Sequence, residues 1–138
     1  MDVLVDSNVI IDILTEDPRW YEWSSQRLER HAERDLLWIN PLIYAEVSIS
    51  FERIEELDDA LPEEIFRRAR LPLEAAFLAG RRFLVYKKRG GRRRSPLPDF
   101  YIGAHAAVTG MALLTRDARR YRTYFPRLAL ICPQVQGG

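Results

Sequence analysis

Four acidic residues occupy positions from which their carboxylates can reach a shared ligand. Asp6 ends the apolar, β-branched run VLVD, and Asp117 follows a second apolar run, MALLT. Asp99 opens a helical pattern after a proline, and Glu46 shares a helical face with apolar residues. Because an unpaired carboxylate is costly to bury, Glu46 either binds a cation, pairs with an arginine or reaches solvent.

If the four carboxylates meet, their chemistry is that of a metal site. Two like charges about 4 Å apart repel by roughly 4 kcal/mol at an effective dielectric constant near 20, and a divalent cation relieves that repulsion. Oxygen ligands select hard ions such as Mg²⁺ or Mn²⁺, whereas the single cysteine and two histidines argue against zinc. Such a site is suited to the hydrolysis of phosphodiesters.

The opening residues predict the elements that carry these acids. Residues 3–6 read as a strand, and Val9, Ile10, Ile13 and Leu14 then fall on one helical face, so a sharp turn lies between them. A strand that is apolar on both faces belongs in a parallel sheet covered by helices, which binds ligands beyond the carboxyl ends of its strands. We therefore expect an α/β fold in which the strands of Asp6 and Asp117 are adjacent.

Further strands and helices follow from the apolar spacing and the capping residues. Strands are expected at residues 36–39, 111–115 and 128–132, and helices at 18–34, 41–49, 72–88 and 98–109. Pro62 divides residues 52–70, which favours two short helices there. We expect Asp17 to cap the helix that begins at Pro18. His31 is expected at the surface and His105 in the core.

The composition limits the class of protein. A chain of 138 residues with 47% hydrophobic and 30% charged residues fits a single globular domain, 1–138. It has no apolar run of membrane-spanning length, so no membrane association is expected. The single Cys132 agrees with a reducing compartment, and we expect a cytoplasmic protein.

The net charge of +1 gives no general attraction to polyanions, but one segment is strongly basic. Its cations are Lys87, Lys88, Arg89, Arg92, Arg93 and Arg94, with glycines between them and prolines after them. A charged run is usually a solvated surface segment. Because this one leads directly to Asp99, it can also guide a polyanion toward an acidic pocket.

The motifs VDSNVIIDIL, NPLIYAEV, PDFYIGAHA and LLTRDARRY, in this order, resemble the PIN-domain ribonucleases, in particular the VapC-type toxins of toxin-antitoxin pairs. The resemblance covers nearly the whole chain. It implies that Asp6, Glu46, Asp99 and Asp117 are the catalytic, metal-binding acids. It also implies that Ser7, Asn8 and Thr115 hold these acids or a water beside them. Asp12 fits the pattern as a supporting acid, with a simple surface acid as the alternative.

The resemblance also implies properties that no local pattern predicts. These are a three-layer α/β/α fold with four to five parallel strands, dependence on Mg²⁺ or Mn²⁺, and endonucleolytic cleavage of structured RNA. The family further implies a homodimer and a cognate antitoxin protein. Together with the basic segment, Arg116 is then expected to contact RNA. A family member that matures RNA without an antitoxin would have much the same sequence.

Three other classes are weaker alternatives. A receiver domain needs a lysine after its last strand, where this chain has Pro133, Gln134 and Val135. A haloacid-dehalogenase-type phosphatase needs an aspartate two positions after Asp6, and Asn8 stands there. A non-catalytic RNA-binding protein would use the basic segment but has no need of four converging carboxylates.

Overall fold

Five parallel strands form one sheet in the order β3-β2-β1-β4-β5. The strands are β1 (Asp2–Val5), β2 (Leu36–Ile39), β3 (Phe66–Arg68), β4 (Ala112–Leu114) and β5 (Leu130–Ile131). Val3 of β1 lies opposite Leu37 of β2 and opposite Ala112 of β4. The computed structural model describes residues 1–134. The expected parallel sheet and the adjacency of β1 and β4 are confirmed.

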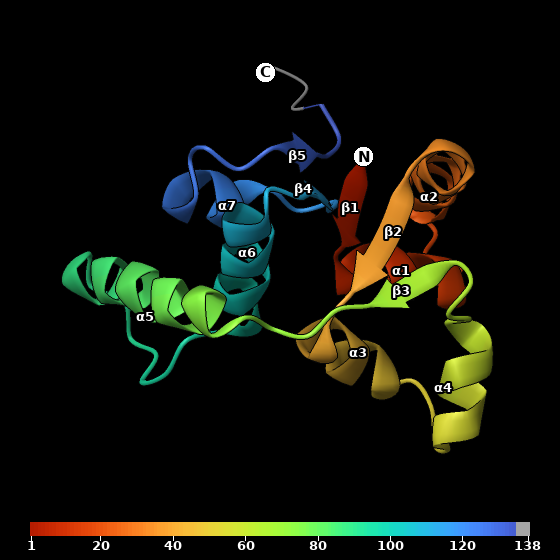
Figure 1. Ribbon diagram of the computed structural model, residues 1–138, viewed down its shortest axis with the longest axis horizontal. Helices are drawn as coiled ribbons and strands as arrows, with labels where there is room; N and C mark the ends of the chain where they lie inside the picture. Colours follow the sequence, from red (N-terminus) through yellow and green to blue (C-terminus); the bar gives the residue numbers. More distant parts are fainter. Residues whose placement is uncertain (135–138) are drawn as a thin grey trace.

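Helices connect the strands and cover the sheet. They are α1 (Ser7–Leu14), α2 (Tyr21–Arg34), α3 (Pro41–Ser48), α4 (Ile54–Ala60), α5 (Leu73–Lys88), α6 (Pro98–Thr109) and α7 (Arg119–Tyr124). The strand order runs outward from β1 in one direction to β3 and in the other to β5. Because parallel crossovers are right-handed, this reversal puts α1 and α2 on one face and α5, α6 and α7 on the other. Figure 1 shows the sheet between α2 and α6. The three-layer arrangement is therefore confirmed.

The core is built on β1. Val3, Leu4 and Val5 have no exposed surface, as expected for a central strand that is covered on both faces. His105 of α6 is buried as well, and its Nδ1 lies 3.0 Å from the Nδ2 of Asn40. The expectation of a buried His105 is confirmed.

Local signals fix two helix ends. The side chain of Asn40 accepts a hydrogen bond of 2.9 Å from the backbone N–H of Ile43, and Pro41 follows as the first residue of α3. At its other end, α6 stops where Gly110 takes a φ of 73°, a left-handed conformation that glycine adopts without strain. Both ends agree with the sequence prediction.

The prediction of two short helices between residues 52 and 70 was wrong. One helix, α4, is followed by the edge strand β3, in which Phe66 pairs with Leu37 and is buried. The backbone N–H of Ala69 continues the ladder by donating to the carbonyl of Ile39, at 2.8 Å. A three-residue strand is stabilised mainly by its neighbour, so the local sequence pattern did not reveal it.

Two further expectations were wrong around α2. His31 is buried rather than exposed, and its Nδ1 lies 2.7 Å from a carboxylate oxygen of Asp35. The helix begins at Tyr21, three residues later than expected from Pro18. Asp17 still accepts hydrogen bonds from the backbone N–H groups of Arg19 and Trp20, at 2.9 Å each, but these stabilise the turn before the helix.

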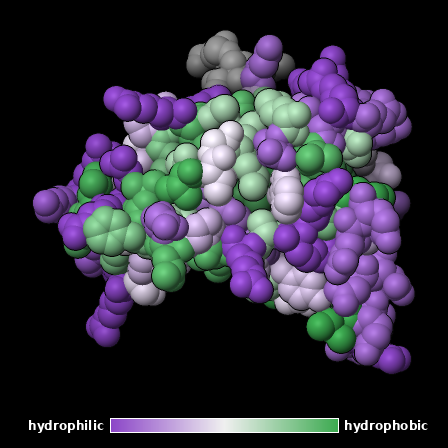
Figure 2. All heavy atoms as spheres, viewed as in Figure 1, coloured by the Kyte–Doolittle hydropathy of each residue, from purple (hydrophilic) through white to green (hydrophobic). Residues whose placement is uncertain are grey.

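Several apolar side chains lie on the surface. Leu73 and Phe77 of α5 are 85% and 65% exposed, and Leu84 of the same helix is exposed too. In Figure 2, hydrophobic atoms gather over the part of the molecule formed by α5 and α6. Among the residues that the structure describes, none of the helices has the length and apolar character needed to cross a membrane.

Candidate active site

The four acids singled out from the sequence line one cavity of about 640 Å³. Asp6 directly follows β1, Glu46 lies on α3, Asp99 is in the first turn of α6, and Asp117 follows β4. Ser7, on α1, lines the same cavity. Asp6 and Asp117, which are 111 positions apart in the sequence, thus line the same cavity.

The topology of the sheet explains this convergence. The strand order reverses between β1 and β4, and open α/β sheets form a crevice at the carboxyl ends of the strands where this happens. The backbone N–H of Asp6 donates to the carbonyl of Leu114 at 2.8 Å, so the two strand ends are directly joined. The chain segments that carry Asp6 and Asp117 therefore leave the sheet side by side.

Asp6 is held by a set of hydrogen bonds. Its Oδ1 accepts from the backbone N–H of Ser7 at 2.8 Å. Its Oδ2 accepts from the hydroxyls of Thr115 and Tyr121, each at 2.9 Å. The amide of Asn8 donates to the Thr115 hydroxyl at 3.1 Å, which holds that threonine in place. With 3% of its surface exposed, Asp6 has a fixed position at the bottom of the cavity.

The surroundings of the cavity disfavour the ionised form of three of its carboxylates. Burial raises the pKa of Asp6 to about 6, and repulsion from Asp99 and Glu46 adds to that effect, although the hydroxyls of Thr115 and Tyr121 oppose it. The pKa values of Glu46 and Asp99 are also raised, in both cases mainly by burial. Glu46 accepts a hydrogen bond of 2.9 Å from the Ser7 hydroxyl. A bound cation would reverse this penalty.

Two arginines from α7 pair with the remaining carboxylates. Arg119 donates through Nε and Nη2 to the two carboxylate oxygens of Asp117, each at 3.1 Å. These hydrogen bonds lower the pKa of Asp117. Arg120 donates through Nη1 to Asp99 at 3.3 Å. Both arginines line the cavity with the acids.

The donor chemistry of the cavity fits a hard divalent cation, because its charged donors are carboxylate oxygens and two of them carry raised pKa values without an arginine partner. The geometry in this structure is not yet that of a closed site. Across residues 1–134, no three acidic, histidine or cysteine side chains are arranged as a ready set of metal ligands. Glu46 and Asp6 would hold the ion, and Asp99 and Asp117 would complete the set after leaving their arginines.

Comparison with known proteins decides the family. The family model described as PIN domain matches residues 3–126. The chain belongs to the PIN domain family. No curated protein sequence matches it.

Solved structures share the fold of this PIN domain over nearly its whole length. A chain of VapBC2 from Rickettsia felis bound to a promoter DNA fragment superimposes with a TM-score of 0.74 at 16% identity, covering 97% of this chain and 100% of that one. For VapBC-1 of nontypeable Haemophilus influenzae the values are 0.71, 18%, 96% and 98%. For FitAcB of Neisseria gonorrhoeae they are 0.64, 20%, 93% and 95%.

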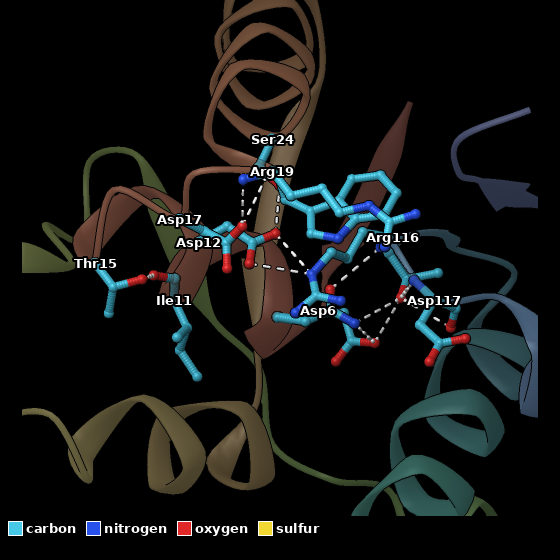
Figure 3. Close-up of polar contacts among 12 residues, drawn as sticks. Asp6, Ile11, Asp12, Thr15, Asp17, Arg19, Ser24, Arg116 and Asp117 are labelled. Atoms are coloured by element: carbon cyan, nitrogen blue, oxygen red, sulfur yellow. Dashed lines mark hydrogen bonds and ion pairs between the residues drawn. The ribbon is translucent and has the colours of Figure 1, made fainter.

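Asp12 lies beside the cavity of the PIN domain, in a separate network (Figure 3). It is 2% exposed and accepts from Nε of Arg116 at 2.9 and 3.1 Å and from the Ser24 hydroxyl at 2.8 Å. The backbone N–H of Arg116 also donates to the side-chain oxygen of Asn8, at 3.2 Å. Arg116 therefore connects this network to Asn8, and its guanidinium faces Asp12.

The basic segment approaches the cavity at one point. Lys87 and Lys88 end α5, while Arg92, Arg93 and Arg94 are exposed in the connection to α6. The guanidinium of Arg89 lies over the ring of Tyr124, 5.6 Å from its centroid, and Tyr124 lines the cavity of the PIN domain. The expectation that these cations contact RNA remains a prediction.

Three residues of α7 were not among the predicted site residues. Tyr121 is buried and hydrogen-bonded to Asp6, and Arg119 and Arg120 pair with site acids of the PIN domain. The sequence offered no signal for them, because a short basic and aromatic segment does not reveal which of its side chains face the site.

Proposed function

We propose that this PIN domain is a metal-dependent endoribonuclease that cleaves structured RNA and serves as the toxin of a toxin-antitoxin pair. The observation that carries the proposal is the convergence of Asp6, Glu46, Asp99 and Asp117 on one cavity at the reversal point of the sheet. The pKa values of Asp6, Glu46 and Asp99 are raised, and an arginine compensates the charge of Asp117. Both features favour a bound Mg²⁺ or Mn²⁺ ion over an empty site.

Each residue has a role that follows from its position. Asp6, after β1, and Glu46, on α3, would hold the ion. The hydroxyls of Thr115 and Ser7 donate to these two carboxylates. The hydroxyl of Tyr121 stabilises the ionised form of Asp6 by donating to it. A bound Mg²⁺ or Mn²⁺ would lower the pKa of a water and so help it to attack a phosphodiester, and it would offset the charge of the phosphate.

The proposed partners are a second copy of this domain and an antitoxin protein. The exposed Leu73 and Phe77 of α5 support a surface covered by another protein chain, and we assign it to a second copy of this domain. One solved structure with the same fold is named as a toxin-antitoxin complex from Klebsiella pneumoniae, which supports a cognate antitoxin for this chain. A cytoplasmic location agrees with an RNA substrate and with a single free cysteine, Cys132.

A cleavage assay with purified protein tests the function. Structured RNA such as bulk transfer RNA should be cut with Mg²⁺ or Mn²⁺ and remain intact with EDTA. Glu46→Gln should lower the cleavage rate by about a hundredfold, because it removes a charged ligand while keeping the shape of the side chain. Asp59→Asn, an equivalent change on the exposed face of α4, should leave the rate unchanged. Metal-independent cleavage, or no cleavage by the folded wild type, would contradict the proposal.

Neutralising the basic segment tests its contact with RNA. The triple variant Arg92→Ala, Arg93→Ala, Arg94→Ala should bind RNA more weakly and with less dependence on salt. If the three arginines each neutralise one phosphate, the slope of log affinity against log salt should become shallower by about 2. Fluorescence anisotropy in EDTA at several salt concentrations measures this without cleavage. An unchanged slope would show that the segment lies outside the RNA path.

A further inference from the structure

Two arginines stand among the acids of the proposed metal site. Arg119 pairs with Asp117 through two hydrogen bonds of 3.1 Å, and Arg120 pairs with Asp99 at 3.3 Å. Both come from α7, and both line the same cavity as Asp6. The two acids without an arginine partner, Asp6 and Glu46, receive hydrogen bonds from hydroxyl and amide groups instead.

These ion pairs are open to exchange. The side chain of Arg119 is 90% exposed and that of Arg120 is 37% exposed, and their carboxylate partners are 43% and 39% exposed. Ion pairs in contact with water are weak, because solvent screens them and long side chains lose freedom in forming them. The guanidinium of Arg120 also lies over the ring of Phe100, at 5.8 Å from its centroid, and this cation–π contact does not depend on Asp99.

A divalent cation competes with both arginines. A carboxylate oxygen that coordinates an ion cannot keep its full hydrogen bonds to a guanidinium, and the two positive groups repel each other. This explains why the four acids share a cavity and yet, among the described residues, form no ready set of metal ligands. Two of the four acids, Asp99 and Asp117, instead pair with arginines of α7.

The released guanidiniums have a second use at the same place. A planar guanidinium binds phosphate oxygens through two parallel hydrogen bonds, and it stays charged at every working pH. Arg119 and Arg120 line the cavity together with Tyr124. The ring of Tyr124 also contacts Arg89 of the basic segment. An RNA backbone that enters the cavity passes these side chains.

We propose that Arg119 and Arg120 are exchangeable counter-ions: they neutralise Asp117 and Asp99 in the metal-free protein, and they transfer to RNA phosphates when the cation binds. This inference rests on the proposed function. The two arginines then have opposite effects on the binding of metal and of RNA. They oppose binding of the metal alone, and they favour binding of RNA to the metal-loaded protein.

Titration of Mn²⁺ alone, followed by calorimetry, tests the first effect. Arg120→Ala should bind Mn²⁺ about three- to tenfold more tightly than the wild type, since one competing charge is gone. The double variant Arg119→Ala, Arg120→Ala should bind it more tightly still. Arg120→Lys, which keeps the charge, should stay near the wild-type affinity. Arg122→Ala is the matched control, because Arg122 is on the same helix but contacts Cys132.

Cleavage kinetics at saturating Mn²⁺ test the second effect. Arg120→Ala should raise KM for RNA about tenfold and change kcat less, because a guanidinium that binds a phosphate of the bound RNA contributes equally to the ground state and the transition state. A purely structural role would not tighten Mn²⁺ binding while weakening RNA binding. Equal or weaker Mn²⁺ binding by Arg120→Ala, in a wild type that binds Mn²⁺ and cleaves RNA, would overturn the inference. A wild type that does neither would instead overturn the proposed nuclease function.

Discussion

Asp6→Asn is expected to abolish cleavage of RNA and, in the metal-free protein, to increase stability at neutral pH. The loss of activity should reach about a thousandfold, because Asp6 is the most deeply buried of the proposed metal ligands and accepts three hydrogen bonds of 2.8–2.9 Å. The gain in stability has a different cause, which is the cost of keeping an ionised carboxylate in that cavity.

The sign of the stability effect follows from the pKa of Asp6. Burial raises this pKa from 3.8 to about 6. Between pH 3.8 and pH 6, Asp6 is therefore protonated in the folded protein and ionised in the unfolded chain. The free energy of unfolding therefore falls as the pH rises from about 4 to 6, and the full penalty, about 3 kcal/mol, is present above pH 6. Asparagine carries no charge, so the variant avoids this penalty.

Thermal unfolding in EDTA measures the difference. Asparagine also loses the charge-assisted bonds from Thr115 and Tyr121, so the net gain should be about 1–3 kcal/mol, or about 3–9 °C in Tm at pH 7.5. At pH 4 the variant and the wild type should unfold at nearly the same temperature. Asp59→Asn should change neither value. A Tm of Asp6→Asn below that of the wild type at pH 7.5 would show that Asp6 stabilises the fold.

The positions of the four acids could be predicted because each stands at a recognisable local boundary. Asp6 and Asp117 end apolar strands, and Asp99 follows a proline that starts a helix. The adjacency of β1 and β4, which are more than 100 residues apart, could only be assumed from the sequence. The pairing of Val5 with Leu114 provides it. Local patterns and one topological rule were sufficient for this part of the site.

Other features depend on contacts that no local pattern contains. Tyr121 lies in a short basic and aromatic helix, which looks the same whether its hydroxyl faces water or Asp6. His31 is surrounded by charged residues in the sequence, but it is buried and contacts Asp35, which also pairs with the N-terminal amine of Met1. The edge strand that contains Phe66 forms because β2 offers a partner. In each case a tertiary contact outweighs the local preference.

Breaking the pair of Asp12 and Arg116 should give the second large effect, in stability. Asp12 is 2% exposed, and Asp12→Ala leaves a partly buried guanidinium and the Ser24 hydroxyl without their acceptor. We expect a loss of about 2–4 kcal/mol in the free energy of unfolding, at the lower end of the range for buried pairs because the Arg116 side chain is 31% exposed. Glu55→Ala, which removes an exposed pair with Arg53, should cost less than about 0.5 kcal/mol.

A double-mutant cycle by urea unfolding separates the pair from its surroundings. Arg116→Ala alone should also be destabilising, because it leaves the buried Asp12 carboxylate unpaired. The double variant should cost at least about 1 kcal/mol less than the sum of the single variants, since neither charge is then left alone. Cleavage should fall about tenfold in every variant of the cycle, because the ion pair with Asp12 fixes the backbone at residue 116, and the N–H of that backbone holds Asn8 in place. Additive losses in stability, or unchanged cleavage, would show that this network does not support the site.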